Sequence, residues 1–263
     1  VHGPFTPAER HKDLYADRTI TRPESAVDSL EGKPALQRQV PGVPAKKKAA
    51  AKKKAGARPG EGGELVRNQL RCLKSIDEGV GRIFQVLADQ GQLDKTLLIF
   101  TSDNGYFWGE HGLGDKRWAY EESIRIPLLM RLPGLIKPGS TIEAMVLNID
   151  IAPTLLDLAG ASLPSTLQGR SLVPLLRGDK TDWRTSFLAE YFQEPGYPRT
   201  PTWQAIRTGR WKYIHYTDLE GMDELYDLQA DPHELKNRIA DPATRETLET
   251  LKAELRERLE ETR

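Results

Sequence analysis

The spacing of apolar residues predicts a long helix followed by a buried strand in the middle of the chain. Between Glu64 and about Gln90, apolar side chains recur at spacings of three and four, the period of an amphipathic helix: Val66, Leu70, Leu73, Ile76, Val80, Ile83 and Leu87. Gly91 then ends the helix, because glycine readily adopts the left-handed conformation found there. Residues 96–101 form a short apolar run without alternation, which is typical of a strand buried on both faces of a parallel sheet. The sequence therefore predicts part of an α/β fold.

The next segment is polar and rich in glycine, and is predicted to be a loop over 102–122. Residues 126–132 form a second apolar run and a second predicted strand. Asn148 or Asp150 can cap a helix that extends to Gly160. These elements extend the predicted α/β part of the chain over residues 64–182.

The pattern changes near Trp183. Four short runs rich in aromatic and β-branched residues are separated by turns that contain glycine or aspartate: 186–192, 203–208, 211–216 and 223–228. A charged helix follows over about 243–262, with acidic and basic side chains spaced to pair along it. We therefore predict a small α+β subdomain over 183–263, built from an antiparallel sheet and a terminal helix.

The beginning of the chain has no sustained period. Residues 1–40 are predicted to be an extended segment of the same α/β domain, and the insertion 41–63 is rich in lysine, alanine and glycine. Like charges and glycine cannot offset the entropy of ordering, so we expect this insertion to be disordered. A basic tract can bind nucleic acid, but no aromatic residues are interleaved for base stacking, which favours a solvated insertion.

Composition excludes several classes of protein. The 38 basic residues balance the 38 acidic ones, so net charge gives no reason to expect a nucleic-acid or membrane partner. No apolar stretch reaches the roughly 18–20 residues needed to span a bilayer. Cys72 is the only cysteine, which rules out an internal disulfide and leaves the redox compartment open.

The sharpest local feature is Ser-Asp-Asn-Gly at 102–105, directly after the first predicted strand. In open α/β sheets, ligands bind beyond the carboxyl ends of the strands. Asp103 and Asn104 both offer oxygen donors, which suit a hard cation such as Ca²⁺ or Mg²⁺, and Gly105 lets the backbone turn sharply. The simpler alternative is that these residues only form a turn.

The surrounding motifs point to a family. From Phe100 to Pro133 the chain carries Thr-Ser-Asp-Asn-Gly, then Gly-Glu-His-Gly, a lysine, and Glu-Glu-Ser-x-Arg-x-Pro. Taken in this order, they resemble the sulfatase family of the alkaline-phosphatase-like superfamily. The helical residues 76–81, the initial His-Gly-Pro-Phe-Thr-Pro, and the segments 206–214 and 224–234 are similar to the same family. The resemblance covers nearly the whole chain except the lysine-rich insertion, and implies a mixed or parallel sheet flanked by helices.

The resemblance also implies roles for individual residues. Asp103 and Asn104 match the pair that coordinates the active-site calcium, with Ca²⁺ expected in preference to Mg²⁺. Lys116 matches the lysine that contacts the sulfate, and His2 matches a histidine that also touches the sulfate ester. His111 is a candidate for the surroundings of the metal, or alternatively for positioning the loop.

These roles are physically consistent with sulfate ester hydrolysis. Negative charge builds on the bridging oxygen as the S–O bond breaks, and a lysine and a divalent cation stabilise it there. A histidine can donate a proton to the departing alkoxide. Arg117 and Arg125 are further candidates for anion contacts, although Arg125, at the edge of a strand, is favoured as a structural ion-pair partner.

The chain departs from the family pattern at its nucleophile. Sulfatases oxidise the Cys or Ser of a Cys/Ser-x-Pro/Ala-x-Arg motif to formylglycine, whereas Cys72 precedes Leu-Lys-Ser-Ile inside a predicted helix. The chain also begins with Val1 rather than methionine and has no signal peptide. We therefore expect the formylglycine and two further aspartate ligands in a missing N-terminal part, and no turnover by these residues alone.

Three functions remain open at this point. The first is a sulfuric ester hydrolase acting on a sulfated small molecule or polysaccharide, with residues 194–201 proposed from position to line the cleft. The second is a phosphodiesterase or phosphatase of the same superfamily, although five histidines leave few ligands for a second metal. The third is an inactive remnant. Localisation is not set by the chain, and the family suggests the periplasm or secretion.

Overall fold

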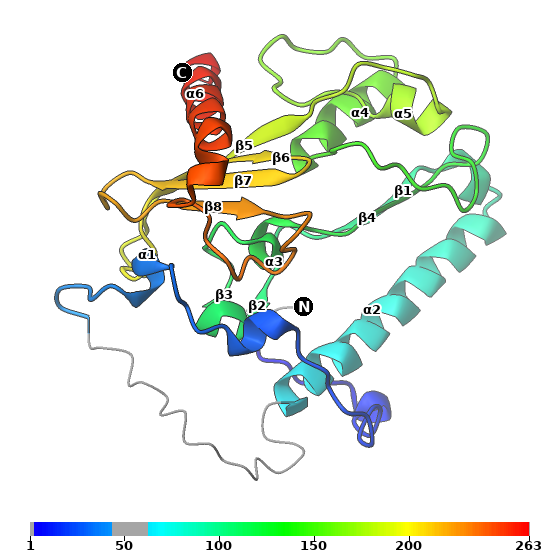
Figure 1. Cartoon of the computed structure of the whole chain (residues 1–263). Helices are drawn as coiled ribbons and strands as arrows, with labels where there is room; N and C mark the ends of the chain where they lie inside the picture. The colour runs from blue at the N-terminus through cyan, green and yellow to red at the C-terminus, as the bar shows by residue number, and fades with distance from the viewer. Residues whose placement is uncertain (1–2, 44–62, 263) are drawn as a thin grey trace. The chain divides into compact units, whose positions relative to one another are not determined.

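The computed structural model describes residues 3–43 and 63–262 (Figure 1). His2 and nearly all of the lysine-rich insertion lie outside the described residues. Among the described residues, 3–23 with 63–97 form one compact unit, and 24–43 with 98–262 form a second. The predicted boundary between residues 182 and 183 stays a prediction.

The first unit is dominated by the predicted long helix, α2 (Gly63–Asp89), which is preceded by the short 3-10 helix Glu9–His11 and followed by another at Leu93–Lys95. Gly91 has a φ of 64°, as expected after a helix end. Glu78 of α2 accepts a hydrogen bond from Arg10 at 3.0 Å, and Arg71 donates to the carbonyl of Leu14 at 2.8 Å. Polar contacts therefore hold the N-terminal segment to α2, while Leu73, Ile76 and Ile83 of the apolar stripe remain exposed.

The two predicted strands of the catalytic part pair with each other in the second unit. β1 (Leu98–Thr101) and β4 (Leu128–Arg131) are antiparallel, with Leu98 opposite Arg131. This differs from the expected parallel pairing and full burial, because Phe100 is 44% exposed and Leu129 is 60% exposed. An unbroken apolar run indicates that both faces of a strand can be covered, but it carries no information on strand direction.

The second unit also contains several short elements. They are the 3-10 helices Glu24–Val27, Glu110–Gly112 and Asn148–Asp150, the helices α1 (Pro34–Gln37), α3 (Glu121–Ile124), α4 (Ile151–Leu158) and α5 (Val173–Arg177), and the strands β2 (Phe107–Trp108) and β3 (Gly114–Asp115). The helix predicted to end at Gly160 is confirmed as α4. Asp150 does not cap it, and instead accepts hydrogen bonds from the backbone of Leu147 and the side chain of Arg184.

The C-terminal sheet confirms the predicted antiparallel arrangement. Its strand order is β5 (Ser186–Tyr191), β6 (Trp203–Thr208), β7 (Trp211–Tyr216) and β8 (Glu224–Asp227). The helix α6 (Arg245–Glu261) follows the 3-10 helix Pro242–Thr244 and lies against the sheet in Figure 1. Both elements of the predicted α+β region therefore form as the sequence pattern indicated.

Period-2 alternation gives this sheet two apolar faces. One face packs against α6 through Ile206, Tyr213, Leu225, Leu248, Leu251 and Leu255. The other packs against the loops that follow β1 through Trp203, Ala205, Ile214, Tyr216, Tyr226, Phe107, Trp118 and Tyr120. The loops after β1, which contain the Ser-Asp-Asn-Gly and Gly-Glu-His-Gly motifs, therefore pack against the C-terminal sheet.

Buried charged residues connect the region of α3 with the C-terminal sheet. Lys212 of β7 is fully buried and pairs with Glu121 of α3 at 3.1 Å and with Glu234 at 2.7 Å. Glu224 of β8 is also fully buried and accepts a hydrogen bond from the hydroxyl of Tyr120 at 2.8 Å. Because a buried charge is costly unless it is paired, these contacts fix the orientation of α3 on the sheet.

Candidate active site

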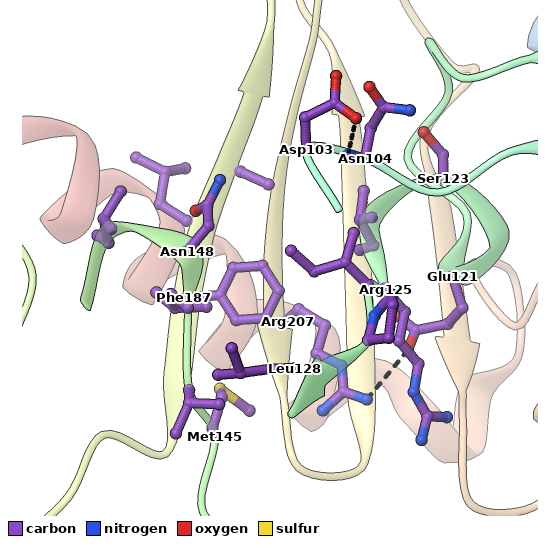
Figure 2. Close-up of a pocket in the computed structure, with 18 of the residues that line it drawn as sticks. Asp103, Asn104, Glu121, Ser123, Arg125, Leu128, Met145, Asn148, Phe187 and Arg207 are labelled. Atoms are coloured by element: carbon purple, nitrogen blue, oxygen red, sulfur yellow. Dashed lines mark hydrogen bonds and ion pairs between the residues drawn. The ribbon is translucent and has the colours of Figure 1, made fainter. Parts of the chain in front are cut away.

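Asp103 and Asn104 lie in the loop directly after β1, at a cleft of about 1170 Å³ in the second unit. The Asp103 carboxylate is 83% exposed and accepts a hydrogen bond from the backbone N–H of Asn104 at 3.0 Å. The Asn104 side-chain amide donates to the carbonyl of Gly105 at 2.8 Å, which leaves its oxygen free to accept. Figure 2 shows the two side chains next to each other at one end of the cleft.

Gly105 holds this loop against α3. Its backbone N–H donates to the carbonyl of Ser123 at 2.7 Å, and a Cβ at this position would stand 2.0 Å from the carbonyl oxygen of Glu122. The glycine is therefore required for close approach of two backbone segments, whereas the sequence suggested only a sharp turn.

Lys116 reaches the same end of the cleft from β3. Its Nζ lies 4.0 Å from Oδ2 of Asp103, and its side chain is about one-third exposed. β3 and β2 form a short antiparallel ribbon in which Trp108 is opposite Gly114, and this ribbon joins the Asp103 loop to Lys116. The structure thus brings together three of the residues that the sequence analysis singled out.

The backbone around Lys116 is held from two sides. The hydroxyl of Ser123 in α3 donates to the carbonyl of Lys116, and the indole N–H of Trp203 in β6 donates to the carbonyl of Arg117 at 2.8 Å. Trp203 is buried, so this contact is shielded from water. The lysine therefore extends from a fixed backbone, with one anchor from the motif-bearing loop and one from the C-terminal sheet.

His111 lies in a buried network rather than against the cleft. Its Nδ1 is 2.7 Å from Asp28, its Nε2 is 3.5 Å from Glu122, and its ring stacks on Tyr120 at 4.3 Å. Burial alone would lower the pKa of His111, but hydrogen bonds to Glu122 and Asp28 outweigh burial and raise it. None of these contacts reaches Asp103 or Asn104, so they support the loop-positioning role.

Lys33 completes this network. It is fully buried, and its Nζ lies 3.1 Å from the Asp28 carboxylate. Asp28 and Lys33 were missed by the sequence analysis, because residues 1–40 show no period that would mark a buried position. The only available signal was the presence of charged residues in a segment otherwise rich in proline and polar side chains.

The two arginines proposed for anion contacts differ in their surroundings. Arg117 pairs with Asp115 and, at 2.9 Å, with Glu194. Burial alone would lower the pKa of Arg117, but the hydrogen bonds to Glu194 and Asp115 outweigh it and raise the pKa. Its charge is therefore already neutralised. Arg125 is exposed and lines the cleft, and within residues 3–43 and 63–262 it has no ion pair, contrary to the structural pairing expected for it.

The donor set for a metal is partial. Asp103 and Asn104 present a carboxylate and an amide oxygen, the donor types that Ca²⁺ takes. In the part of the chain that the structure describes, no group of three or more His, Cys, Asp or Glu side chains could hold a metal ion. The two side chains offer donor types that suit Ca²⁺, but a complete site would need further oxygen ligands.

Comparison with known proteins identifies the family. A profile described as "Sulfatase" matches residues 1–161, more than half of the chain. The chain belongs to the sulfatase family. A second profile, the C-terminal part of N-sulphoglucosamine sulphohydrolase, matches residues 109–261 of this sulfatase chain.

Individual relatives agree with the family. An N-acetylglucosamine-6-O-sulfatase of Bacteroides thetaiotaomicron is 43% identical over 178 residues, covering 66% of this sulfatase chain and 32% of that protein. Human N-acetylglucosamine-6-sulfatase is 37% identical over 202 residues, covering 65% and 36%. The chain thus spans about a third of the length of these relatives.

Solved structures share the fold. One is a protein in complex with its substrate D-glucosamine-2-N,6-O-disulfate, with a TM-score of 0.83 and 30% identity, covering 97% of this sulfatase chain and 62% of that one. A phosphonate monoester hydrolase from Silicibacter pomeroyi has a TM-score of 0.77 and 26% identity, covering 98% and 54%. The fold is therefore the α/β fold of the alkaline-phosphatase-like superfamily, with a C-terminal antiparallel sheet and terminal helix. No helix among the described residues is long and apolar enough to cross a membrane.

Proposed function

We propose that this chain supplies the C-terminal part of the active site of a sulfuric ester hydrolase. The observation that carries the proposal is the convergence of Lys116 with Asp103 and Asn104 at one end of a single cleft. A sulfate ester is an anion, and Lys116 is the cation held closest to the oxygen donors that suit Ca²⁺.

The residues present account for part of the catalytic advantage. Lys116 extends from a backbone fixed by Ser123 and Trp203, so its charge is held at this end of the cleft. Preorganised charge stabilises the negative charge that grows on the leaving oxygen, and it needs no rearrangement during the reaction. Asp103 and Asn104 would hold a Ca²⁺ ion, which when bound supplies further stabilisation of the same charge.

The nucleophile is proposed to lie outside these 263 residues. The chain contains no Cys/Ser-x-Pro/Ala-x-Arg motif, and Cys72 lies within α2. The curated relatives are about three times as long as the matched part. We therefore propose that a formylglycine and further metal ligands come from an N-terminal part, that His2 contacts the sulfate, and that the present residues alone do not turn over substrate.

The substrate class follows from the relatives. Two sulfatases acting on N-acetylglucosamine 6-sulfate groups are among the similar proteins, and a similar structure holds a glucosamine disulfate. We propose a sulfated amino sugar, free or within a polysaccharide. Similarity to an extracellular sulfatase of Drosophila melanogaster supports a periplasmic or secreted location.

A phosphonate or phosphate monoesterase is the second candidate function. It is favoured by 35% identity to a multifunctional alkaline phosphatase superfamily protein of Trinickia caryophylli and by the fold of the Silicibacter pomeroyi hydrolase. Both ester classes present a tetrahedral anion, so the contacts of Lys116 and a cation would serve either. A third possibility, an inactive remnant, requires that no N-terminal part exists.

The decisive experiment compares three esters. The product of the complete source gene is assayed with glucosamine 6-sulfate, a phenyl phosphonate ester and a phenyl phosphate, with and without Ca²⁺. We expect the sulfate ester to be hydrolysed fastest, and Lys116→Ala to lower kcat/KM by about a hundredfold or more. Lys180→Ala, which removes an exposed lysine that does not line the cleft, is the matched control. Faster hydrolysis of the phosphonate would favour the second candidate, and an unchanged rate in Lys116→Ala would refute the assignment.

A further inference from the structure

The loop between β5 and β6, residues 192–202, has a defined conformation although much of it is exposed. The backbone N–H of Gln193 donates to the hydroxyl of Thr202 at 3.1 Å, closing the base of the loop. Within it, the N–H of Tyr197 donates to the carbonyl of Glu194 at 2.9 Å, and that of Thr200 to the carbonyl of Tyr197 at 3.0 Å. These bonds form two successive turns, so the loop presents its side chains in fixed directions.

Arg117 anchors this loop beside Lys116. Its Nε donates to Glu194 at 2.9 Å, and the hydroxyl of Tyr191 donates to the same carboxylate at 3.0 Å. The guanidinium carbon lies 3.3 Å from the centre of the Tyr197 ring. Only 16% of the Arg117 side chain is exposed, so the guanidinium is largely occupied by these contacts and by Asp115.

Tyr197 is held on one face and remains partly exposed. A planar guanidinium stacks on an aromatic ring and limits its rotation. Tyr197 nevertheless remains 43% exposed, and its hydroxyl has no hydrogen-bond partner within the described residues. A fixed aromatic ring with one open face is suited to an apolar surface such as the C–H face of a sugar ring.

The position of Tyr197 relative to the reacting group is set by sequence neighbours. Lys116 and Arg117 are adjacent, with Cα atoms about 3.8 Å apart. The charge of Lys116 also contributes to the lowered pKa of Glu194, after the larger effect of the hydrogen bond from Arg117. Residues 192–202 do not themselves line the cleft, contrary to the expectation for 194–201, but Tyr191 and Trp203 on either side of the loop do. A group that extends from a sulfate held by Lys116 beyond the edge of the cleft would therefore meet the loop.

We propose that Tyr197, held by Arg117 and Glu194, is the stacking platform for the sugar ring that carries the sulfate, and that this loop determines which sulfated group is accepted. The inference rests on the proposed function only in that Lys116 receives the sulfate. It assigns recognition of the sulfate and of the sugar to two different residues, Lys116 for the anion and Tyr197 for the ring.

The test separates the two kinds of recognition. In the product of the complete source gene, affinity for glucosamine 6-sulfate is measured as KM, or as Kd by calorimetry if there is no turnover. Affinity for inorganic sulfate is measured as its inhibition constant or Kd. We expect Tyr197→Ala to weaken binding of the sulfated sugar by about tenfold and binding of inorganic sulfate by less than about twofold.

Three further variants make the comparison specific. Tyr197→Phe keeps the ring and should retain the affinity of the original protein for the sugar, whereas Phe192→Ala removes a more exposed aromatic ring of the same loop, for which the described residues show no anchoring contact, and should change neither affinity. Glu194→Gln, which loosens the anchor, should weaken sugar binding without affecting inorganic sulfate. Melting temperatures establish that each variant is folded.

Three results would contradict the stacking platform or the proposed function. If Tyr197→Ala leaves sugar binding unchanged, or weakens sugar and inorganic sulfate alike, the platform is refuted. If the unsubstituted protein binds the sulfated sugar but hydrolyses no sulfate ester, the proposed function fails while the platform is still decided by the binding data.

Discussion

Replacing Glu224 by glutamine tests whether ionisation of this buried carboxyl group lowers the stability of the fold. Glu224 is fully buried and accepts hydrogen bonds from three tyrosines, Tyr120 at 2.8 Å, Tyr226 at 2.7 Å and Tyr216 at 3.3 Å. Burial raises the pKa of Glu224 from 4.5 to about 7, and the opposing hydrogen bonds from Tyr226 and Tyr120 do not offset it. The carboxyl is therefore more easily protonated in the folded state than in the unfolded state.

The pH dependence of stability follows from the difference between the pKa of Glu224 in the folded state and in the unfolded state. Because the folded-state pKa is raised, the penalty is absent below pH 4.5, grows between pH 4.5 and 7, and is fully present above about pH 7. A shift of this size corresponds to about 3 kcal/mol. Glutamine cannot ionise, so Glu224→Gln should lack this loss. Relative to the original protein, the variant should gain about 3 kcal/mol in the free energy of unfolding between pH 4.5 and pH 8.

Urea unfolding followed by tryptophan fluorescence at the two pH values measures this change. The other titrating groups are shared by both proteins, so their contributions cancel in the difference. Any change in stability caused by replacing the carboxyl group with a carboxamide also cancels, because it does not depend on pH. If the difference between the variant and the original protein is the same at both pH values within about 0.5 kcal/mol, burial of an ionised Glu224 carries no penalty and the reasoning is wrong.

Two further predictions concern the contacts that hold the site. Lys212→Met should destabilise the fold by about 3–5 kcal/mol, because the buried carboxylate of Glu234 loses its cation while Glu121 keeps only Arg207, and this is measured by urea unfolding. Gly105→Ala should destabilise by about 1–3 kcal/mol and weaken Ca²⁺ binding in calorimetry, because the new Cβ would force the loop away from Glu122.

Each has a matched control within the chain. Lys252→Met removes a partly exposed lysine of α6 whose pairing with Glu249 is at the surface, and it should change stability by less than about 1 kcal/mol. Gly114→Ala places a methyl group in open space at an ordinary φ and should leave Ca²⁺ binding intact. Equal effects of a variant and its control would contradict the corresponding prediction.

Local patterns predicted the local elements well. The bounds of β6 and β7 match the predicted runs 203–208 and 211–216, because each strand of a hairpin pairs with its sequence neighbour and shows its own alternation. The direction of β1 could not be predicted in the same way. Its pairing with β4 is made across a long loop, and the apolar run is the same for either direction.

The site was predicted in part for a similar reason. Asp103, Asn104 and Lys116 were found because they lie within one short stretch whose order resembles the sulfatase family. The partners that hold the site come from distant positions, as with Asp28 on His111 and Glu194 on Arg117, and no periodicity links them. Residue type alone gave a wrong expectation for Arg117. The sequence analysis proposed that it contacts the anion of the substrate, but carboxylates of the protein neutralise its charge.

The short helix α3 contacts two regions that lie far apart in the sequence. Glu121 of α3 is paired with Lys212 in β7, while Ser123, two residues later, holds the backbone of Lys116. A change in the C-terminal sheet can therefore be transmitted to the lysine by a rotation of a single turn of helix. Loss-of-function substitutions in this chain should accordingly fall into two clusters in the sequence, about a hundred residues apart, whose effects on activity are not additive.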